Sequence, residues 1–190
     1  DISDRKQAEI NLKQQQAFLR HLIDANPNLI FVKDWHGRFA LANQALANLY
    51  GTTVEDLLGK TDADFNPNPV EVEQFLQADR EVMVSLTRKW IAEETVSTPN
   101  GKFRYFQTSK TPLIDADGVA RRILGVATDI TARKHVELAL IESESRFRAI
   151  FNGTYQFTGL LSLDGTLLEL NQTALTGTGI ARDDAIDRPW

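Results

Sequence analysis

Three histidines are the side chains of this sequence best suited to bind a metal or to transfer a proton at neutral pH. They are His21, His36 and His135. No two of them have the spacing of about three to five residues that joins metal ligands on one element, so we predict that each lies at the surface. The sequence has no cysteine, which excludes a thiolate nucleophile, a disulfide and a cysteine-bound metal. This absence also fits a reducing compartment such as the cytoplasm.

Two aspartates, Asp62 and Asp64, form the other candidate pair, since paired carboxylates can share acid–base work or bind a cation. Their neighbours include Thr61, Asn66 and two prolines. These residue types favour turns and caps, so we predict loop caps and no catalytic role. The sequence also lacks a phosphate-binding glycine-rich motif and a nucleophile elbow. We therefore expect no catalytic residues and no metal site in this segment.

Composition and charge limit the functions that this chain can have. The formal net charge of −5 and the lack of a lysine–arginine stripe argue against nucleic acid as a partner. No apolar stretch approaches the roughly 20 residues that cross a bilayer, so we expect no membrane contact in this segment. The sequence begins at Asp1 rather than at methionine, and we interpret it as a piece of a longer protein.

The chain contains an internal repeat with an offset of 128 residues. Its first twelve residues, "DISDRKQAEINL", share six identities with residues 129–140, "DITARKHVELAL", where chance gives about one. The offset also aligns Gly37 with Gly165 and Asn43 with Asn171 without a gap. We therefore predict the tail of one unit, one complete unit, and the first third of another.

The complete unit has the pattern of strands and helices that is typical of an α+β domain. Two strands joined by a turn at Gly37 are followed by short helices, for which Asn43 provides an N-cap and Gly51 a stop. A longer helix over residues 70–86 precedes three strands linked by hairpin turns. The predicted strands are residues 28–34, 40–43, 89–98, 102–114 and 120–130. We expect an antiparallel sheet with helices on one face.

This order of elements, with the segments "GKTDADF", "SKTPLIDADG" and "GVATDITARK", resembles the PAS sensory domain. The resemblance implies a PAS fold, with a five-stranded antiparallel sheet that carries helices on one face and is flanked by helical linkers. It divides the chain into a linker helix (1–21), a complete PAS domain (22–130), a connecting helix (131–151) and the N-terminal part of a second PAS domain (152–190). We expect this last segment to be loosely ordered, or completed by another chain, because it lacks three strands of its sheet.

The resemblance also assigns signal output to the exit of the last strand. In PAS domains the aspartate and threonine of the end phrase help to set how the following helix leaves the sheet, and they match Asp129 and Thr131. Arg133 is the expected ion-pair partner nearby. The residue types alone fit a helix N-cap at Thr131 and an acidic group at the positive end of the helix. Both roles are compatible, since a cap at the junction fixes the helix direction.

PAS domains sense a small molecule or a protein partner through a cavity under their helices. In this chain the candidate lining residues are Phe75, Met83, Trp90 and Phe106. The missing cysteine disfavours a covalently bound flavin, and the longer helix has no histidine to bind haem. A small organic ligand, a non-covalent flavin stacked on Trp90, or no ligand at all stay open. Trp90 also fits ordinary strand packing.

The two linkers carry an apolar heptad seam with the same polar interruption. The seam residues are Val136, Leu140, Phe147 and Ile150 in one linker, and Ala8, Leu12, Leu19 and Leu22 in the other. Ser143 and Gln15 occupy equivalent gaps in the two seams. We predict parallel coiled-coil linkers in a homodimer, in which the polar residue fixes the register and weakens the helix pair. In the alternative, each apolar stripe lies on the sheet of its own domain in a monomer.

The resemblance to PAS domains implies a sensing and relay module of a larger cytoplasmic signalling protein, with a sensor histidine kinase as the first choice of parent and a diguanylate cyclase as the second. Neighbouring PAS units in the same chain are the other expected partners. Two alternatives are a dimerising spacer that has lost its ligand, and an enzyme. The lack of a paired nucleophile and base argues against the enzyme. A ligand retained by natively purified protein would separate a sensor from a spacer.

Overall fold

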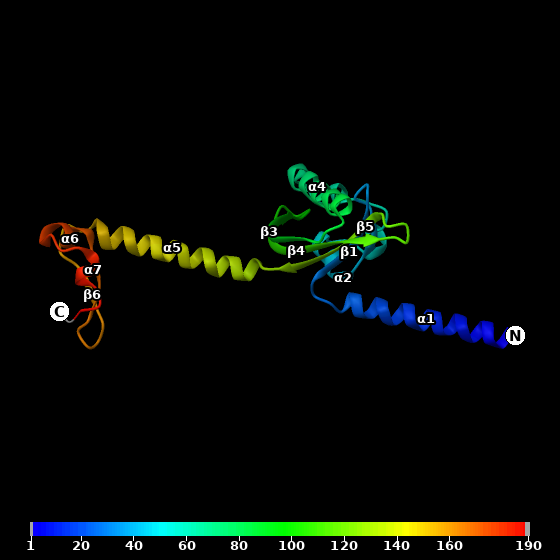
Figure 1. Cartoon of the computed structure of the whole chain (residues 1–190), viewed down its shortest axis with the longest axis horizontal. Helices are drawn as coiled ribbons and strands as arrows, with labels where there is room; N and C mark the ends of the chain where they lie inside the picture. The colour runs from blue at the N-terminus through cyan, green and yellow to red at the C-terminus, as the bar shows by residue number, and fades with distance from the viewer. Residues whose placement is uncertain (1, 189–190) are drawn as a thin grey trace. The chain divides into compact units, whose positions relative to one another are not determined.

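The computed structural model of the chain describes residues 2–188, with side chains from Arg5 onward. The chain divides into two compact units, Asp1–Ala132 and Arg133–Trp190, which we call unit 1 and unit 2. Unit 1 contains a sheet with its covering helices, and unit 2 contains most of a long helix and a smaller sheet (Figure 1). The hydrophobic core of unit 1 and that of unit 2 share no residue.

A five-stranded antiparallel sheet forms the centre of unit 1. Its strands are β1 (Leu29–Asp34), β2 (Phe39–Ala42), β3 (Lys89–Ser97), β4 (Phe103–Ile114) and β5 (Ala120–Asp129). Their order in the sheet is β2-β1-β5-β4-β3, so the first strand pairs with the last. The three C-terminal strands form consecutive hairpins, as their turn residues predict. The predicted number and direction of the strands are therefore confirmed.

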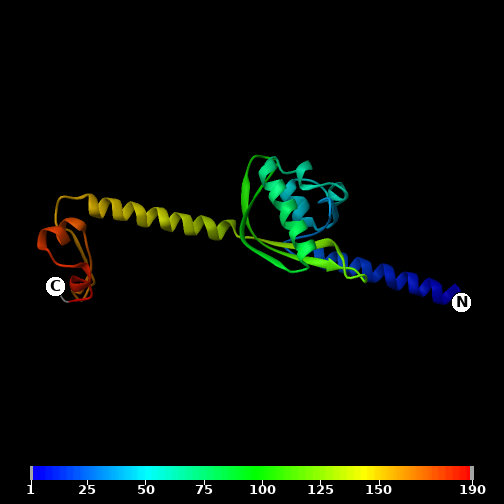
Figure 2. The same ribbon diagram turned by 45° about the horizontal axis from the view of Figure 1, so that its top comes forward.

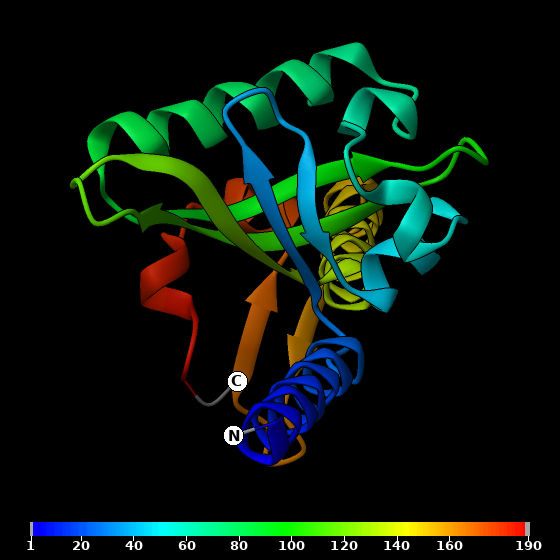
Figure 3. The same cartoon turned by 90° about the vertical axis from the view of Figure 1, so that its right-hand side faces the viewer.

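Helices cover one face of this sheet (Figures 2 and 3). The helical elements of unit 1 are α1 (Ile2–Asp24), α2 (Gln44–Tyr50), α3 (Val54–Leu57), the 3-10 turn η1 (Asp62–Asp64) and α4 (Pro69–Ser85). The longest covering helix, α4, lies against β3, β4 and β5, while α2 lies against β1. The segment between β2 and β3 in the sequence thus forms the helical layer on this sheet.

Alternation along the strands places one set of side chains under the helices. In β4, Phe106, Thr108 and Lys110 are buried, while the residues between them are only half-buried. Phe31 of β1 enters the core beside Gly125 of β5, where an added β-carbon would lie 2.2 Å from its ring. Gly125 therefore gives the Phe31 ring the space that any larger residue would take.

Asn43 begins α2 and also ties α2 to the preceding segment. Its Oδ1 accepts hydrogen bonds from the amides of Leu46 at 3.2 Å and Ile30 at 3.0 Å. Its Nδ2 donates to the carbonyl of Ile23, in the last turn of α1, at 3.1 Å. The helix ends at Gly51, which has a left-handed backbone with φ 67°. The predicted N-cap and helix stop are confirmed, and the cap has the further effect of joining α1 to the domain.

Unit 2 repeats the opening of unit 1. The elements are α5 (Thr131–Gly153), β6 (Gly159–Leu161), β7 (Leu167–Leu170), α6 (Gln172–Thr178) and α7 (Arg182–Ala185). The strands β6 and β7 form a two-stranded antiparallel sheet. Asn171 caps α6, because its Oδ1 accepts from the Ala174 amide at 3.0 Å and the Thr158 amide at 3.1 Å. The Oδ1 atoms of Asn43 and Asn171, which the sequence repeat aligns, thus make equivalent contacts in the two units.

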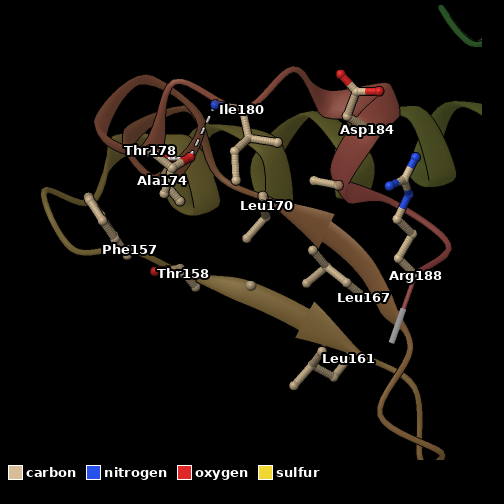
Figure 4. A pocket seen from close by; sticks show the side chains of 12 residues that line it. Phe157, Thr158, Leu161, Leu167, Leu170, Ala174, Thr178, Ile180, Asp184 and Arg188 are labelled. Carbon is tan, nitrogen blue, oxygen red and sulfur yellow. Dashed lines mark hydrogen bonds between the residues drawn. The ribbon is translucent and has the colours of Figure 1, made fainter. Parts of the chain in front are cut away.

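An apolar groove of about 430 Å³ lies beside the small sheet of unit 2 (Figure 4). Leu161, Leu167, Leu170 and Ala174 are among its lining residues. Strands and helices occupy residues 159–161, 167–170, 172–178 and 182–185, and completion of this segment by another chain stays a prediction. Pro189 and Trp190 lie outside the described residues.

Candidate functional site

A small cavity lies in the core of unit 1, between the sheet and its helices. Its volume is about 30 Å³, which is room for about one or two water molecules. Apolar and aromatic side chains form most of the wall, and five polar residues complete it. These polar residues are Lys33, Tyr50, Asp62, Glu94 and Lys110. Lysines are seldom buried unless they are paired, so their partners define the site.

Lys33 of β1 is buried among aromatic rings and a carboxylate. Its ammonium group donates a hydrogen bond to Oδ2 of Asp62 in η1. Oδ1 of the same carboxylate accepts the hydroxyl of Tyr50 at 3.1 Å. Lys33 Nζ also lies 4.8 Å from the ring centre of Phe31 and 4.9 Å from that of Phe39. The faces of these rings attract the ammonium group, so the charge is held from several sides.

Lys110 of β4 forms a second buried ion pair, with Asp79 of α4. Its Nζ donates to Asp79 Oδ1 at 2.6 Å and to the carbonyl oxygen of Phe75 at 3.2 Å. The other oxygen of Asp79 lies 3.7 Å from Lys33 Nζ and has no hydrogen-bond partner among the described residues. The two ion pairs therefore form one charge network that joins β1, β4, η1 and α4.

Electrostatic interactions keep the Lys33 ammonium group charged. Burial by itself lowers the pKa of Lys33, but the carboxylates of Asp62 and Asp79 outweigh burial and raise that pKa above its usual value. Burial raises the pKa of the Tyr50 hydroxyl, and the charge of Asp62 raises it further, so the hydroxyl stays neutral. With Glu94 in the wall, the cluster contains two cations and three carboxylates. Its formal charge is therefore −1.

A surface groove of about 440 Å³ lies on the other side of one cavity wall. Phe75 of α4 and Glu94 of β3 line both the cavity and this groove. The remaining groove residues are Gln74, Ala78, Lys89, Ile91, Glu93 and Thr95. Phe75 and Glu94 thus separate the buried charge network from the groove between α4 and β3.

Three of the four residues predicted to line a ligand cavity are buried, but only one of them faces this cavity. Phe75 is part of its wall, whereas Phe106 is buried in the surrounding core. Met83 is buried in the last turns of α4 and lines a separate surface pocket beside Trp35. The short apolar runs of the sequence do not reveal which side of an element faces a cavity.

Trp90, the fourth, lies on the opposite face of the sheet from the cavity. It pairs with Ser109 of β4, whose strand neighbours Thr108 and Lys110 are buried under the helices. Because side chains alternate along a strand, Trp90 points away from the helices, and it is 56% exposed. Trp90 therefore does not line this cavity, in contrast to its place among the candidate lining residues.

The two candidate aspartates have different roles. Asp64 accepts a hydrogen bond from the Thr61 amide at 2.8 Å and forms a capping box with Thr61, as predicted for a loop cap. Asp62 is instead buried as the partner of Lys33. Its predicted role as a cap is wrong, because the lysine that pairs with it lies 29 residues away in the sequence.

The start of α5 is fixed to β4 at the end of the sheet. Thr131 Oγ1 accepts a hydrogen bond from the Tyr105 amide at 3.0 Å, and the Ile130 amide donates to the Tyr105 carbonyl at 2.9 Å. Asp129 Oδ1 accepts from the Thr131 amide at 2.8 Å, while its Oδ2 accepts from Arg104 Nη1 at 3.2 Å. The helix therefore leaves the last strand in a direction that two residues of β4 help to hold.

The ion pair of Asp129 is not the one that the sequence predicts. Its partner is Arg104 of β4, whereas Arg133 is exposed on α5. Burial opposes ionisation of Asp129, but hydrogen bonds from Thr131 and Arg104 outweigh it, so the pKa of Asp129 lies below its usual value. Arg104 is 25 residues from Asp129 in the sequence, and only the pairing of β4 with β5 brings them together.

The apolar seams of the two linker helices are exposed. Exposed seam residues are Leu12, Leu19 and Leu22 of α1, and Val136, Leu140, Phe147 and Ile150 of α5. Ser143 and Gln15, at the polar positions, are exposed as well. The monomeric alternative requires each stripe to be covered by the sheet of its own domain, and these side chains are not covered in that way.

Sequence reasoning missed Lys33, Asp79 and Lys110. One signal was present, because Lys33 has the same phase along β1 as the buried residues Leu29 and Phe31. A lysine at such an inward position is uncommon and indicates a buried partner. The partner itself could not be identified, since Asp79 is 31 residues from Lys110 on a different element.

The structure offers no metal-ligand cluster, because no three His, Cys, Asp or Glu side chains of the described residues come together as ligands. His21, His36 and His135 are exposed, as predicted. Among the described helices, none combines the length and the apolar character that a bilayer crossing needs.

Comparisons with known proteins identify the family. A family model described as the PAS fold matches residues 23–135. The aerobic respiration control sensor protein ArcB of Escherichia coli K12 is 31% identical over 171 residues, which cover 85% of this chain and 21% of ArcB. The virulence sensor protein BvgS of Bordetella bronchiseptica is 35% identical over 137 residues, which cover 70% of this chain and 11% of BvgS. A diguanylate cyclase of Vibrio cholerae is 32% identical over 103 residues, covering 54% of this chain and 32% of the cyclase.

A solved structure shows the same fold. VqmA, crystallised in a complex with a ligand and DNA, superposes with a TM-score of 0.53 and 27% sequence identity, and the match covers 63% of this chain and 51% of VqmA. The chain spans 21% of the length of ArcB and 11% of that of BvgS, so it corresponds to a segment of such sensor proteins. The family match over residues 23–135, the five-stranded antiparallel sheet and these relatives show that the chain belongs to the PAS family.

Proposed function

We propose that this chain is a sensing and relay segment of a cytoplasmic sensor histidine kinase that acts as a homodimer. In this proposal residues 22–130 are the sensory domain, 1–21 and 131–151 are linkers, and 152–190 open a second PAS domain. The two sensor proteins among its relatives support this parent, since the match to ArcB covers 85% of the chain. The partners are a second copy of the chain and the neighbouring PAS units.

The observation that carries the proposal is the continuity of α5 between two anchored ends. It begins at Thr131, which is hydrogen-bonded to β4, and continues without a break to Gly153, a length of roughly 35 Å. Near its end, Asn152 Oδ1 accepts a hydrogen bond from the amide of Gln172, the first residue of α6, at 2.9 Å. A stiff helix that is fixed at both ends passes a change of direction at one end to the other.

The exposed seams support dimerisation through the linkers. An apolar stripe with steps of three and four residues covers one face of a helix and is suited to a second helix of the same kind. The seam of α5 is interrupted by Ser143, and roughly three heptads are only marginally stable by themselves. When two arrangements of a helix pair differ little in free energy, a sensory domain can shift the pair from one arrangement to the other.

Ser143→Leu tests this proposal, and Ser145→Leu is the matched control. Both serines are exposed on α5, but only Ser143 lies in the seam. We expect Ser143→Leu to strengthen dimerisation of the 190-residue chain by about tenfold, because it completes the apolar seam. Ser145→Leu should leave the dimerisation constant within about twofold of the wild type. Analytical ultracentrifugation measures both.

The same pair of variants tests the relay in the full-length protein. In Ser143→Leu the completed seam should hold the helix pair in one arrangement, so autophosphorylation should stay at one level with and without a stimulus. Ser145→Leu should respond to the stimulus as the wild type does. If Ser143→Leu changes neither dimerisation nor output, the linkers do not act as a coiled-coil relay.

A ligand-free spacer is the second candidate, and the small volume of the cavity, about 30 Å³, favours it. Mass spectrometry of natively purified protein separates the two functions, because a sensor that binds a metabolite tightly retains it. The diguanylate cyclase among the relatives favours a second kind of parent, in which the same relay controls a different output domain. Assays of the full-length protein for kinase and for cyclase activity distinguish these parents.

A further inference from the structure

The two buried lysines have hydrogen-bonding capacity that the protein does not use. An ammonium group has three N–H donors. Lys33 donates to Asp62, while Lys110 donates to Asp79 and to the carbonyl of Phe75. Both lysines line the cavity. Beyond these hydrogen bonds, Lys33 Nζ has among the described residues only the Asp79 Oδ2 atom at 3.7 Å, which is too long for a hydrogen bond, and buried donors that are not fully used are a place for water or a ligand.

The ring of Phe75 fills the space in front of these donors. Its centre lies 5.9 Å from Lys33 Nζ and 5.8 Å from Lys110 Nζ. A phenyl ring attracts an ammonium group through its face but is only a weak hydrogen-bond acceptor. A flat ring that carries an oxygen or nitrogen acceptor would keep the contact with the aromatic wall and also satisfy the free donors.

A route from solvent to this space passes Phe75 itself. The cavity of about 30 Å³ is too small for a ring compound, since ligand pockets enclose some hundreds of Å³. The groove of about 440 Å³ lies beyond Phe75 and Glu94. If the Phe75 side chain turns toward the groove, the cavity and the groove become continuous, and the volume vacated by its ring becomes part of the site.

Charge limits the class of molecule that fits. Lys33 and Lys110 are already neutralised by Asp62 and Asp79, and Glu94 adds a negative charge at the wall. An anion would pass Glu94 and compete with the buried carboxylates, while a cation would face two buried ammonium groups. An uncharged ligand leaves both ion pairs intact, and breaking a buried pair is strongly unfavourable.

We propose that the space held by the Phe75 ring is a binding site for a small, flat, uncharged ring compound with a carbonyl oxygen or ring nitrogen as acceptor. Lys33 and Lys110 bind the acceptor, and Phe75 occupies the site when no ligand is present. This inference rests on the proposed sensing function and names the class of its ligand.

The site is connected to the start of α5 through β4. Lys110 donates to the backbone carbonyl of Phe75 and to Asp79, both in α4, so a ligand that takes a donor of Lys110 acts on a contact between α4 and β4. The same strand carries Tyr105 and Arg104, which bond to Thr131 and Asp129. A ligand bound to Lys110 therefore acts on the strand that sets the direction of the output helix.

Binding of four small probes to the 190-residue chain and its variants tests this site. The probes are 2-pyridone, which is flat and uncharged with a carbonyl acceptor, and benzoate, benzylamine and toluene. The variants are Phe75→Ala, which vacates the site, and Phe75→Ala with Lys110→Met, which removes one donor. We expect Phe75→Ala to bind 2-pyridone at least about tenfold more tightly than the wild type, and the double variant to lose that gain. Nuclear magnetic resonance titrations give the dissociation constants, and circular dichroism confirms that each variant is folded.

Three results would overturn the proposal. Equal binding of toluene and 2-pyridone would show an apolar hole without a role for the lysines. Preference for benzoate or benzylamine would assign a charged ligand. The absence of 2-pyridone binding to folded Phe75→Ala would exclude the site, and Phe75→Leu takes the place of Phe75→Ala if the alanine variant does not fold.

The outcome is independent of the relay test. Ser143→Leu changes the linker and leaves the cavity untouched, whereas the probe titrations report on the cavity without any output domain. A failed relay with intact 2-pyridone binding would thus refute the proposed function alone, and the reverse result would refute the ligand class alone.

Discussion

Buried charged side chains are the feature that distinguishes the core of unit 1 at the scale of single residues. Lys33, Asp79 and Lys110 are each at most 2% exposed. Removing one partner of a buried pair costs about 3–5 kcal/mol, but replacing both partners by apolar residues is often neutral or stabilising. Stability by itself therefore does not explain why these charged side chains are buried. Recognition of a polar group on a ligand gives such a reason.

Glu71 is another buried carboxylate, outside the lysine network, and its hydrogen bonds make stability depend on pH. It accepts from Asn66 Nδ2 at 2.9 Å, from the Ser97 amide at 2.7 Å and from Ser97 Oγ at 2.9 Å. Burial by itself raises the pKa of Glu71, but these hydrogen bonds outweigh burial, so the pKa lies below its usual value of 4.5. The charged form is thus favoured by folding.

Glu71→Gln should therefore destabilise unit 1 at neutral pH by about 1–3 kcal/mol, because it weakens the hydrogen bonds to a charged acceptor. A depressed pKa contributes stability that is complete above the usual value of 4.5 and disappears as the pH falls through the lower, folded value. The difference from the wild type should accordingly shrink below pH 4.5 in urea unfolding experiments. Glu73→Gln, at an exposed position of the same helix, is the control, and a difference that stays constant with pH would contradict this account.

At the scale of elements, the incoming helix α1 is joined to unit 1 by one asparagine. The Asn43 side chain holds α1, β1 and α2 through the contacts with Ile23, Ile30 and Leu46. Asp24 adds to this joint, because its Oδ1 accepts from the Gln44 amide at 3.0 Å. Asp24 of α1 thus accepts from a backbone N–H at the N-terminus of α2, and Asn43 donates to a backbone carbonyl at the end of α1. Both groups lack a partner within their own helix.

Asn43→Ala should cost unit 1 about 2–4 kcal/mol, since it removes an N-cap and leaves buried backbone groups without partners. Asn48→Ala, on the exposed side of the same helix, should change stability by less than about 0.5 kcal/mol. Hydrogen exchange should also become faster in the last turn of α1 in Asn43→Ala. Equal effects of the two variants would mean that the joint contributes little.

At the scale of the whole molecule, unit 2 repeats the opening elements of unit 1, but the two units differ in the chemistry of their cores. The repeat aligns Lys33 with Leu161, and it aligns Tyr50 with Thr178. The groove of unit 2 is lined mostly by apolar residues and has no lysine (Figure 4). A ligand that requires buried ammonium donors would therefore bind unit 1 and not unit 2.

Separate cores also predict that unit 1 folds without unit 2. The buried cluster of unit 1 spans residues 29–127, and that of unit 2 spans residues 167–174. Removal of residues 152–190 should change the free energy of unfolding of unit 1 by less than about 0.5 kcal/mol. Thermal unfolding of residues 1–151, followed by the circular dichroism of the sheet, measures this. A loss of several kcal/mol would show that unit 2 supports unit 1.

The sequence by itself determined the elements of this protein and the repeat that organises them. Strand periodicity, the cap at Asn43, the stop at Gly51 and the hairpin turns are short-range features, and the structure has each of them. The end phrase that begins with Asp129 also predicted the start of the long helix, and α5 does begin at Thr131. These features depend on neighbours within a few residues, so a single sequence displays them.

Only the tertiary structure decided which side chains form the site. Lys33 meets Asp62 across 29 residues, Lys110 meets Asp79 across 31, and Arg104 meets Asp129 across 25. The strand phase of Lys33, a signal that sequence reasoning missed, indicates an inward side chain but not the residue that it meets. The face on which Trp90 lies was likewise set by the pairing of β3 with β4. Contacts between distant elements depend on sheet order and register, and no local pattern records either.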